Sequence, residues 1–314
     1  MNRSRMNSLK KILFAQILII LLNPTPIMAQ YDRSEVEAIV QKNVDKENFT
    51  GTVLIAEEGE VQFLQSYGLA DVENDIALTN KTRYGIASIT KMITAILTLQ
   101  LVQNDSLKLT TSVADMLPGL EIPNAESITI HHLLLHISGL PDEKRSVYRA
   151  PLEAEAYVKE VLSNPGTQKQ LGVFNYTNID YILLGLIIEK VTGKSWEDNV
   201  ESRITKPLNM NDTGFLQLQA LPENYAYTYS VNWLGRLKKD PDFYIDNFWA
   251  AGNMYSTAED LLKLDQAMYG EQLLSDEMKK TMFKSYPEYN YSGYSVWTYN
   301  YPFINSQPKI MERR

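Results

Sequence analysis

The chain has 314 residues, of which 44% are hydrophobic and 22% are charged, a composition typical of a globular protein with one large domain or two closely packed ones. Its formal net charge of −8 argues against a nucleic-acid partner. The absence of cysteine excludes disulfides, thiol catalysis, cysteine-bound zinc and lipid attachment to cysteine.

The first 29 residues have the pattern of a secretory signal peptide. Basic residues precede an apolar run over 12–22, and the segment ends on a small residue, Ala29. The run is too short to span a bilayer, and the alternative is an uncleaved N-terminal anchor. We therefore expect a periplasmic or secreted protein, with no stable membrane span after the signal is cleaved.

The next elements are a helix, a hairpin and a second helix. A capping box at residues 34–37 and helical spacing of apolar residues predict a helix over 34–46. Two β-branched and aromatic runs, 50–56 and 61–67, predict a hairpin that opens an antiparallel sheet. In the stretch 88–102, apolar residues surround the helix axis, which indicates a helix buried on nearly all sides.

Helical spacing and loop punctuation dominate the region from 104 to 245, which we interpret as an all-helical insertion. Its expected helices are 130–136, 151–163, 179–192 and 195–203. After it come a capped helix over 256–269 and an aromatic, strand-like run over 291–301. The expected divisions of the chain are 1–29 (signal peptide), 30–103 and 246–314 (two parts of one α/β domain), and 104–245 (helical domain).

Ser88 and Lys91 are the first candidates for chemistry. Residues three apart share a helix face, and burial lowers the pKa of a lysine enough for it to take a proton from a serine. The start of a helix also favours developing negative charge. The same Ser-x-x-Lys spacing recurs at Ser8 and Ser306, and the alternative is that Ser88 is an N-cap and Lys91 a surface residue.

The stretch Tyr176-Thr177-Asn178 is the second candidate. Alternate residues of an extended loop point the same way, so the phenol of Tyr176 and the carboxamide of Asn178 can face one pocket. A phenol beside a lysine can relay a proton, and a carboxamide can bind a substrate amide. The alternative is a turn in which Asn178 caps the helix that follows.

Four blocks occur along the chain in a fixed order: ASITK at 87–91, LLLHISGLP at 133–141, YTNIDYILLG at 176–185 and MYSTAEDL at 254–261. Together they resemble the penicillin-recognising serine hydrolases, in the branch of class C β-lactamases, D-Ala-D-Ala carboxypeptidases and related esterases. The resemblance runs from about residue 32 to 314. It implies an α/β (α+β) sandwich, an antiparallel sheet flanked by helices with an inserted helical domain, and an active site between the two.

The resemblance also implies the roles of the residues. Ser88 is acylated, Lys91 and Tyr176 handle its proton, and Asn178 holds the amide side chain of the substrate. We expect an exported serine hydrolase that acts on a β-lactam, a D-Ala-D-Ala peptide or a small ester. Tyr-x-Asn in place of Ser-x-Asn points away from class A β-lactamases, so we assign no glutamate as a deacylating base.

One element of the family pattern is absent from the sequence. The family carries Lys/His-Thr/Ser/Gly-Gly on an edge strand, which contacts the substrate carboxylate and lies near an oxyanion-hole N–H. Here only 190–193 and 136–139 come near this pattern, each with one residue too many. We therefore expect a chain truncated before its last strands and closing helix. The alternative function is a catalytically inactive homologue that at most binds peptidoglycan peptides or a partner.

Metal and organic cofactors are not expected. His132 and His136 are four residues apart, a spacing that can bind a metal on a helix, but no third ligand or His-Glu-x-x-His accompanies them. We expect His136 to hydrogen-bond backbone near the turn at Gly139. The expected partner is a small-molecule or peptide substrate, and the sequence does not indicate an oligomeric state.

Overall fold

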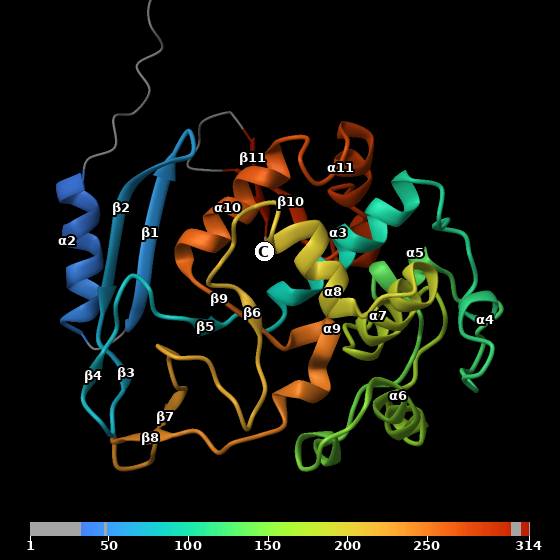
Figure 1. Ribbon diagram of the computed structural model, residues 1–314, viewed down its shortest axis with the longest axis horizontal. Coiled ribbons are helices and arrows are strands. Elements are labelled where there is room, and N and C mark those ends of the chain that lie inside the picture. Colours follow the sequence, from blue (N-terminus) through green and yellow to red (C-terminus); the bar gives the residue numbers. More distant parts are fainter. Residues whose placement is uncertain (1–32, 47–48, 303–308, 314) are drawn as a thin grey trace, which may run out of the picture. The chain divides into compact units, whose positions relative to one another are not determined.

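The computed structural model describes residues 33–46, 49–302 and 309–313 (Figure 1). The predicted signal peptide, 1–29, lies outside the described residues. The chain divides into two compact units, Met1–Phe49 and Thr50–Arg314. The described part of the first unit contains helix α2 (Arg33–Val44), within two residues of the bounds predicted from the capping box.

The predicted hairpin is confirmed. Strand β1 (Gly51–Glu57) pairs antiparallel with β2 (Glu60–Tyr67), with Gly51 opposite Tyr67. The turn between them contains Glu58 and Gly59, both with positive φ, and glycine adopts that conformation without a steric penalty. β1 also contacts helix α10, which carries part of the core.

A short three-stranded sheet includes the strand just before helix α3 (Ile89–Gln103) in the chain. Its antiparallel order is β5 (Tyr84–Gly85), β9 (Met254–Ser256) and β6 (Gly214–Phe215). This pairing brings the residues just before Ser88 next to a segment more than a hundred residues later in the chain. The other small strands are β3 (Leu69–Asp71), β4 (Ile76–Ala77), β7 (Tyr229–Val231), β8 (Leu237–Lys239), β10 (Thr298–Pro302) and β11 (Lys309–Arg313).

Helix α3 (Ile89–Gln103) lies in the centre of the core, as its all-round apolar sequence predicted. It packs against α7 (Ile179–Thr192), α8 (Trp196–Val200), α9 (Trp249–Gly252) and α11 (Asp276–Met282), and Figure 1 shows it among these helices. Ile93, Ile96 and Leu99 have no exposed surface. Burial of each such side chain contributes roughly 1.5–3 kcal/mol, so α3 is held as a rigid rod.

The remaining helices are α4 (Val113–Met116), α5 (Ile130–Leu134), α6 (Ala154–Leu162) and α10 (Ala258–Tyr269), with a π-helical turn (Glu201–Thr205) after α8 and 3₁₀ turns at Arg145–Tyr148, Pro165–Thr167, Ile245–Phe248 and Pro287–Tyr289. Of these helices, α5, α6 and α10 lie inside their predicted ranges, whereas α4 was not predicted. The bounds predicted for α7 are those observed. The cap of α10 is Thr257, whose side chain accepts from the Asp260 amide.

Two expectations for local structure need correction. The predicted strand over 291–301 begins only at Thr298, because Tyr291 and Ser295 adopt positive φ and interrupt the extended backbone. Helices in the predicted helical region end at Thr205, and residues 214–239 contribute strands β6, β7 and β8. Among the described residues, no helix has both the length and the apolar character that crossing a membrane requires.

The contact between α7 and α9 gives a test of the core. A Cβ added at Gly185 would lie 2.6 Å from the Ala250 Cβ and 2.7 Å from a ring carbon of Trp249. We expect Gly185→Ala to lower the free energy of unfolding by about 1–3 kcal/mol, because the two helices must move apart. Urea unfolding measures this, and Gly119→Ala is the control, since an added Cβ there meets nothing within 4 Å. Equal stability of the two variants would contradict this packing.

Candidate active site

Ser88 lies at the start of α3 and is exposed. It occupies the N-cap position, but its side chain makes no capping hydrogen bond, so the hydroxyl is available for other contacts. The preceding residue, Ala87, has a φ of 44°. Positive φ at a non-glycine residue is strained, and such strain is often found at functional sites.

The Lys91 side chain lies beneath this hydroxyl and is only 1% exposed, which rules out the surface-lysine alternative. Its Nζ lies 3.1 Å from Ser88 Oγ and donates to Asn178 Oδ1 at 2.7 Å and to the Ala251 carbonyl at 2.8 Å. Burial lowers the pKa of the Lys91 amine to about 7, although the carboxyl groups of Glu143 and Asp180 act in the opposite direction.

Tyr176 covers the same amine from the loop before α7. Lys91 Nζ lies 5.0 Å from the centroid of the Tyr176 ring. The ring also stacks on Trp297, with centroids 5.8 Å apart. Burial raises the pKa of the Tyr176 phenol, while a hydrogen bond with Ser88 acts in the opposite direction. The phenol is therefore protonated near neutral pH.

Asn178 stands at the N-cap position of α7 but makes no capping hydrogen bond with its side chain. Instead its Oδ1 accepts from Lys91, and its Nδ2 donates to Glu143 Oε1 at 2.7 Å. Tyr148 donates to the same Glu143 oxygen at 3.1 Å. These contacts set the orientation of the carboxamide. The alternative in which the Asn178 side chain only caps α7 is therefore wrong.

The block 136–141 supports this loop from below. His136 Nδ1 lies 3.2 Å from Asp180 Oδ2, and Ser138 donates to Asp180 Oδ1 at 2.6 Å, with the three side chains at most 4% exposed. Burial lowers the pKa of His136, so its ring is neutral near pH 7. The Asn175 amide donates to the His136 carbonyl at 2.8 Å, which ties the block to the Tyr176 loop.

The structure thus brings together all four residues selected from the sequence, and it adds two groups that we did not select. Glu143 orients Asn178, and the Ala251 carbonyl accepts from Lys91. A carbonyl oxygen leaves no trace in the sequence. Glu143 follows the LLLHISGLP block, and Asp180 lies in an otherwise apolar helix. A charged residue at either position is the sequence signal that could have pointed to a role in the site.

The two histidines considered for a metal have separate partners. His132 Nδ1 contacts Thr129 in the capping box of α5, whereas His136 contacts Asp180 rather than only backbone. Within the described parts of the chain, no three His, Asp or Glu side chains are grouped so that they could hold a metal ion.

Asp180 provides a test of the support beneath the site. Replacing Asp180 with Ala leaves the buried Ser138 hydroxyl and the His136 ring without their acceptor. We expect the free energy of unfolding to fall by about 3 kcal/mol. Asp115→Ala is the control, because this exposed carboxyl bonds only within its own helix start, and its loss is expected to stay below about 1 kcal/mol. Chemical denaturation compares the two, and a similar small loss in both would argue against the buried network.

Comparison with known proteins shows which family the chain belongs to. Residues 36–303 match the Beta-lactamase family model. The chain is 29% identical over 277 residues to penicillin-binding protein 4* of Bacillus subtilis (strain 168), covering 82% of this chain and 60% of that protein. It is 30% identical over 267 residues to the teichoic acid D-alanine hydrolase of Staphylococcus aureus, covering 83% and 66%. The match thus spans less than two thirds of the length of these relatives.

Solved structures with a similar fold include a related hydrolase. The D-amino acid amidase of Ochrobactrum anthropi SV3, in complex with L-phenylalanine amide, superposes with a TM-score of 0.73 at 26% identity, over 84% of this chain and 79% of that one. With a family match over most of its length and the predicted sandwich-type fold, this chain belongs to the Beta-lactamase family, that of the penicillin-recognising serine hydrolases.

Proposed function

We propose that this chain is an exported serine hydrolase that cleaves amides or esters through an acyl-enzyme at Ser88. The observation that carries the proposal is the exposed Ser88 hydroxyl 3.1 Å from the buried Lys91 amine, whose pKa is lowered to about 7. A serine hydroxyl needs such a base, and a lysine can act as one only when part of it is neutral at working pH.

The hydrogen bonds around Lys91 suit a neutral amine. A neutral amine has two N–H groups and one lone pair, and two acceptors, Asn178 Oδ1 and the Ala251 carbonyl, lie within 2.8 Å of Nζ. The lone pair then faces the hydroxyl of Ser88. In the charged form the third N–H donates to Ser88 instead. Loss of one proton from Lys91 therefore converts a donor toward Ser88 into an acceptor from it.

The proton then has a route to the leaving group. Ser88 Oγ attacks the carbonyl carbon of the substrate while its proton moves to Lys91. Tyr176, whose raised phenol pKa keeps it protonated, donates a proton to the departing nitrogen or oxygen and is reprotonated from Lys91. The backbone N–H of Ser88, at the positive end of α3, is a donor for the oxygen that becomes negative. Water then releases the acyl group.

The names of the relatives suggest the substrates to try first. They are a penicillin-binding protein, a teichoic acid D-alanine hydrolase and a D-amino acid amidase. We propose a β-lactam, a D-alanyl peptide, or a small ester or amide of a D-amino acid. The signal-like residues 1–29 support a periplasmic or secreted location.

A second candidate is a catalytically inactive protein that binds peptidoglycan peptides or a partner. It applies if the protein has no Lys/His-Thr/Ser/Gly-Gly after Tyr176, and residues 177–314 contain none. A missing oxyanion donor typically lowers kcat about a hundredfold to a thousandfold. Turnover of nitrocefin or of a p-nitrophenyl ester by the 314-residue chain distinguishes the two candidates.

Covalent labelling tests the nucleophile. A fluorescent penicillin or a fluorophosphonate is expected to label the purified protein, and Ser88→Ala is expected to abolish the labelling, because Ser88 is the only side-chain hydroxyl hydrogen-bonded to Lys91 in the described part of the chain. Loss of a catalytic nucleophile typically lowers the rate on the order of a millionfold. Ser306→Ala, which removes another Ser-x-x-Lys serine, is the control and should label normally. Labelling that survives in Ser88→Ala would refute the assignment.

The pH dependence of labelling tests the base. The rate should be low below pH 7 and reach a plateau above it, because Lys91 with a pKa of about 7 must be neutral to accept the proton. Glu143→Gln removes a charge that raises this pKa, so the midpoint should move to lower pH. Glu271→Gln removes the same charge from an exposed loop and should leave the midpoint in place. An unshifted midpoint in Glu143→Gln would exclude this coupling.

A further inference from the structure

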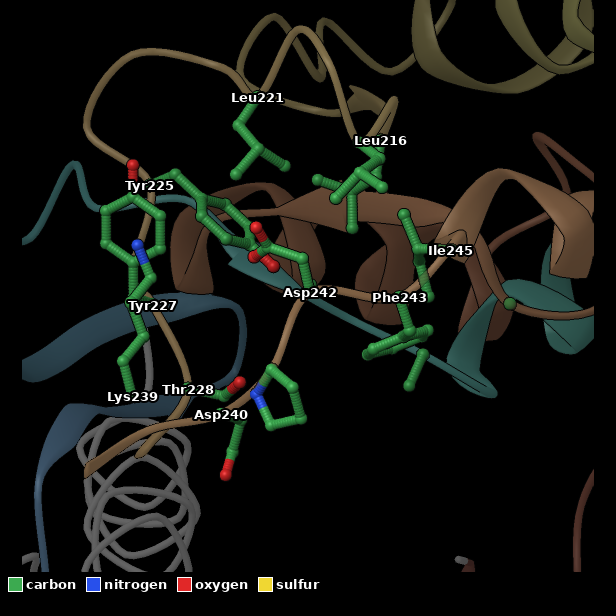
Figure 2. Close-up of a pocket in the computed structure, with 15 residues that line it drawn as sticks. Leu216, Leu221, Tyr225, Tyr227, Thr228, Lys239, Asp240, Asp242, Phe243 and Ile245 are labelled. Carbon is green, nitrogen blue, oxygen red and sulfur yellow. The ribbon is translucent and has the colours of Figure 1, made fainter. Parts of the chain in front are cut away.

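A pocket of about 170 Å³ lies beside the nucleophile. It includes Ala87, the residue before Ser88, and Gly252, the residue after the Ala251 carbonyl that accepts from Lys91. The rest of its lining comes mainly from the segment 216–245, which contains strands β7 and β8 (Figure 2). The pocket therefore reaches the backbone neighbours of both Ser88 and Ala251.

The walls of the pocket are mostly apolar. Figure 2 shows Leu216 and Leu221 on one wall and Phe243 and Ile245 on another. The Tyr225 ring closes a third side. Carbon-rich walls of this kind favour an apolar group, because its transfer from water is favourable by about 25 cal/mol for each Å² buried.

Gly85 is one of the lining residues, and it lies close to two others. A Cβ at Gly85 would lie 3.1 Å from the Tyr225 hydroxyl and 3.2 Å from Leu216 Cδ1, tighter than ordinary contact. A side chain at residue 85 would therefore press on Tyr225 and Leu216, which both line the pocket. Its volume is close to that of a cavity of about 150 Å³ that holds one benzene ring.

Charges at the pocket restrict what can enter. Two carboxyl groups, Asp240 and Asp242, belong to its lining, and in Figure 2 the Asp242 side chain points inward whereas Asp240 points away. The single lysine of the lining, Lys239, has its Nζ 3.5 Å from the centroid of the Tyr227 ring. The lining thus carries two carboxyl groups and one ammonium group, so a negative group that enters the pocket would meet a net negative charge.

From these observations we infer that the pocket binds one uncharged aromatic or branched aliphatic group of the substrate, attached next to the bond that Ser88 cleaves. The inference rests on the proposed function and narrows its substrate class. It favours amides and esters with one ring-sized apolar substituent over those with a methyl group, and it disfavours substituents that carry a negative charge.

Three esters with similar leaving groups test the preference. They are ethyl acetate as the small reference, ethyl phenylacetate with a ring on the acyl side, and benzyl acetate with a ring on the alcohol side. We expect kcat/KM for at least one ring-bearing ester to exceed that for ethyl acetate by about tenfold or more. Leu221→Trp, which fills the pocket, should abolish this preference. Leu237→Trp, on the exposed face of β8, should retain it.

The charge is tested with a carboxylate placed on the ring of the preferred ester. We expect this substrate to lose about tenfold in kcat/KM, and Asp242→Asn to restore part of the loss. The inference is overturned if neither ring-bearing ester is preferred, if the preference survives in Leu221→Trp, or if the carboxylate is tolerated equally. Labelling of Ser88 by a fluorophosphonate keeps these results separate from a failure of the proposed function, because that reaction does not require the pocket preference.

Discussion

The burial of one lysine amine is the constraint on which the site depends. An ammonium group inside a protein core is strongly disfavoured, so Lys91 needs either partners that satisfy it or a lowered pKa, and here it has both. Its partners come from α7 and α9, which are far from α3 in the sequence. The hydrogen bonds and the lowered pKa of Lys91 therefore depend on how α3, α7 and α9 pack together.

The second layer of the site is a set of buried polar groups that hold the Tyr176 loop. Asp180 binds both the His136 ring and the Ser138 hydroxyl, and all three side chains are almost completely buried. In such surroundings an unsatisfied polar group costs about 1–3 kcal/mol, so each member depends on the others. This dependence places Tyr176 and Asn178 over the amine with a defined orientation.

The polar site and the neighbouring pocket differ in chemistry. Glu143 and Asn178 orient polar atoms near Lys91, and Tyr176 brings its phenol to the same amine. The pocket formed by 216–245 is largely apolar and is one ring in size. A hydrolase needs both kinds of surface, because polar groups lower the barrier of the reaction and an apolar pocket selects which substrate reaches it.

Local patterns in the sequence were sufficient for several features. The apolar residues around 88–102 and 179–192 predicted the two central helices, and the runs on either side of 57–60 predicted the hairpin. The order of the four sequence blocks indicated the family, and the spacing of Ser88 and Lys91 on one helix face indicated their contact. These features depend on residues that are close together in the chain. For such residues, the spacing of apolar positions and the residue types indicate the local structure directly. Only the tertiary structure decided the depth of Lys91, the role of Glu143, the Ala251 carbonyl and the pocket, because each depends on atoms brought together from distant segments.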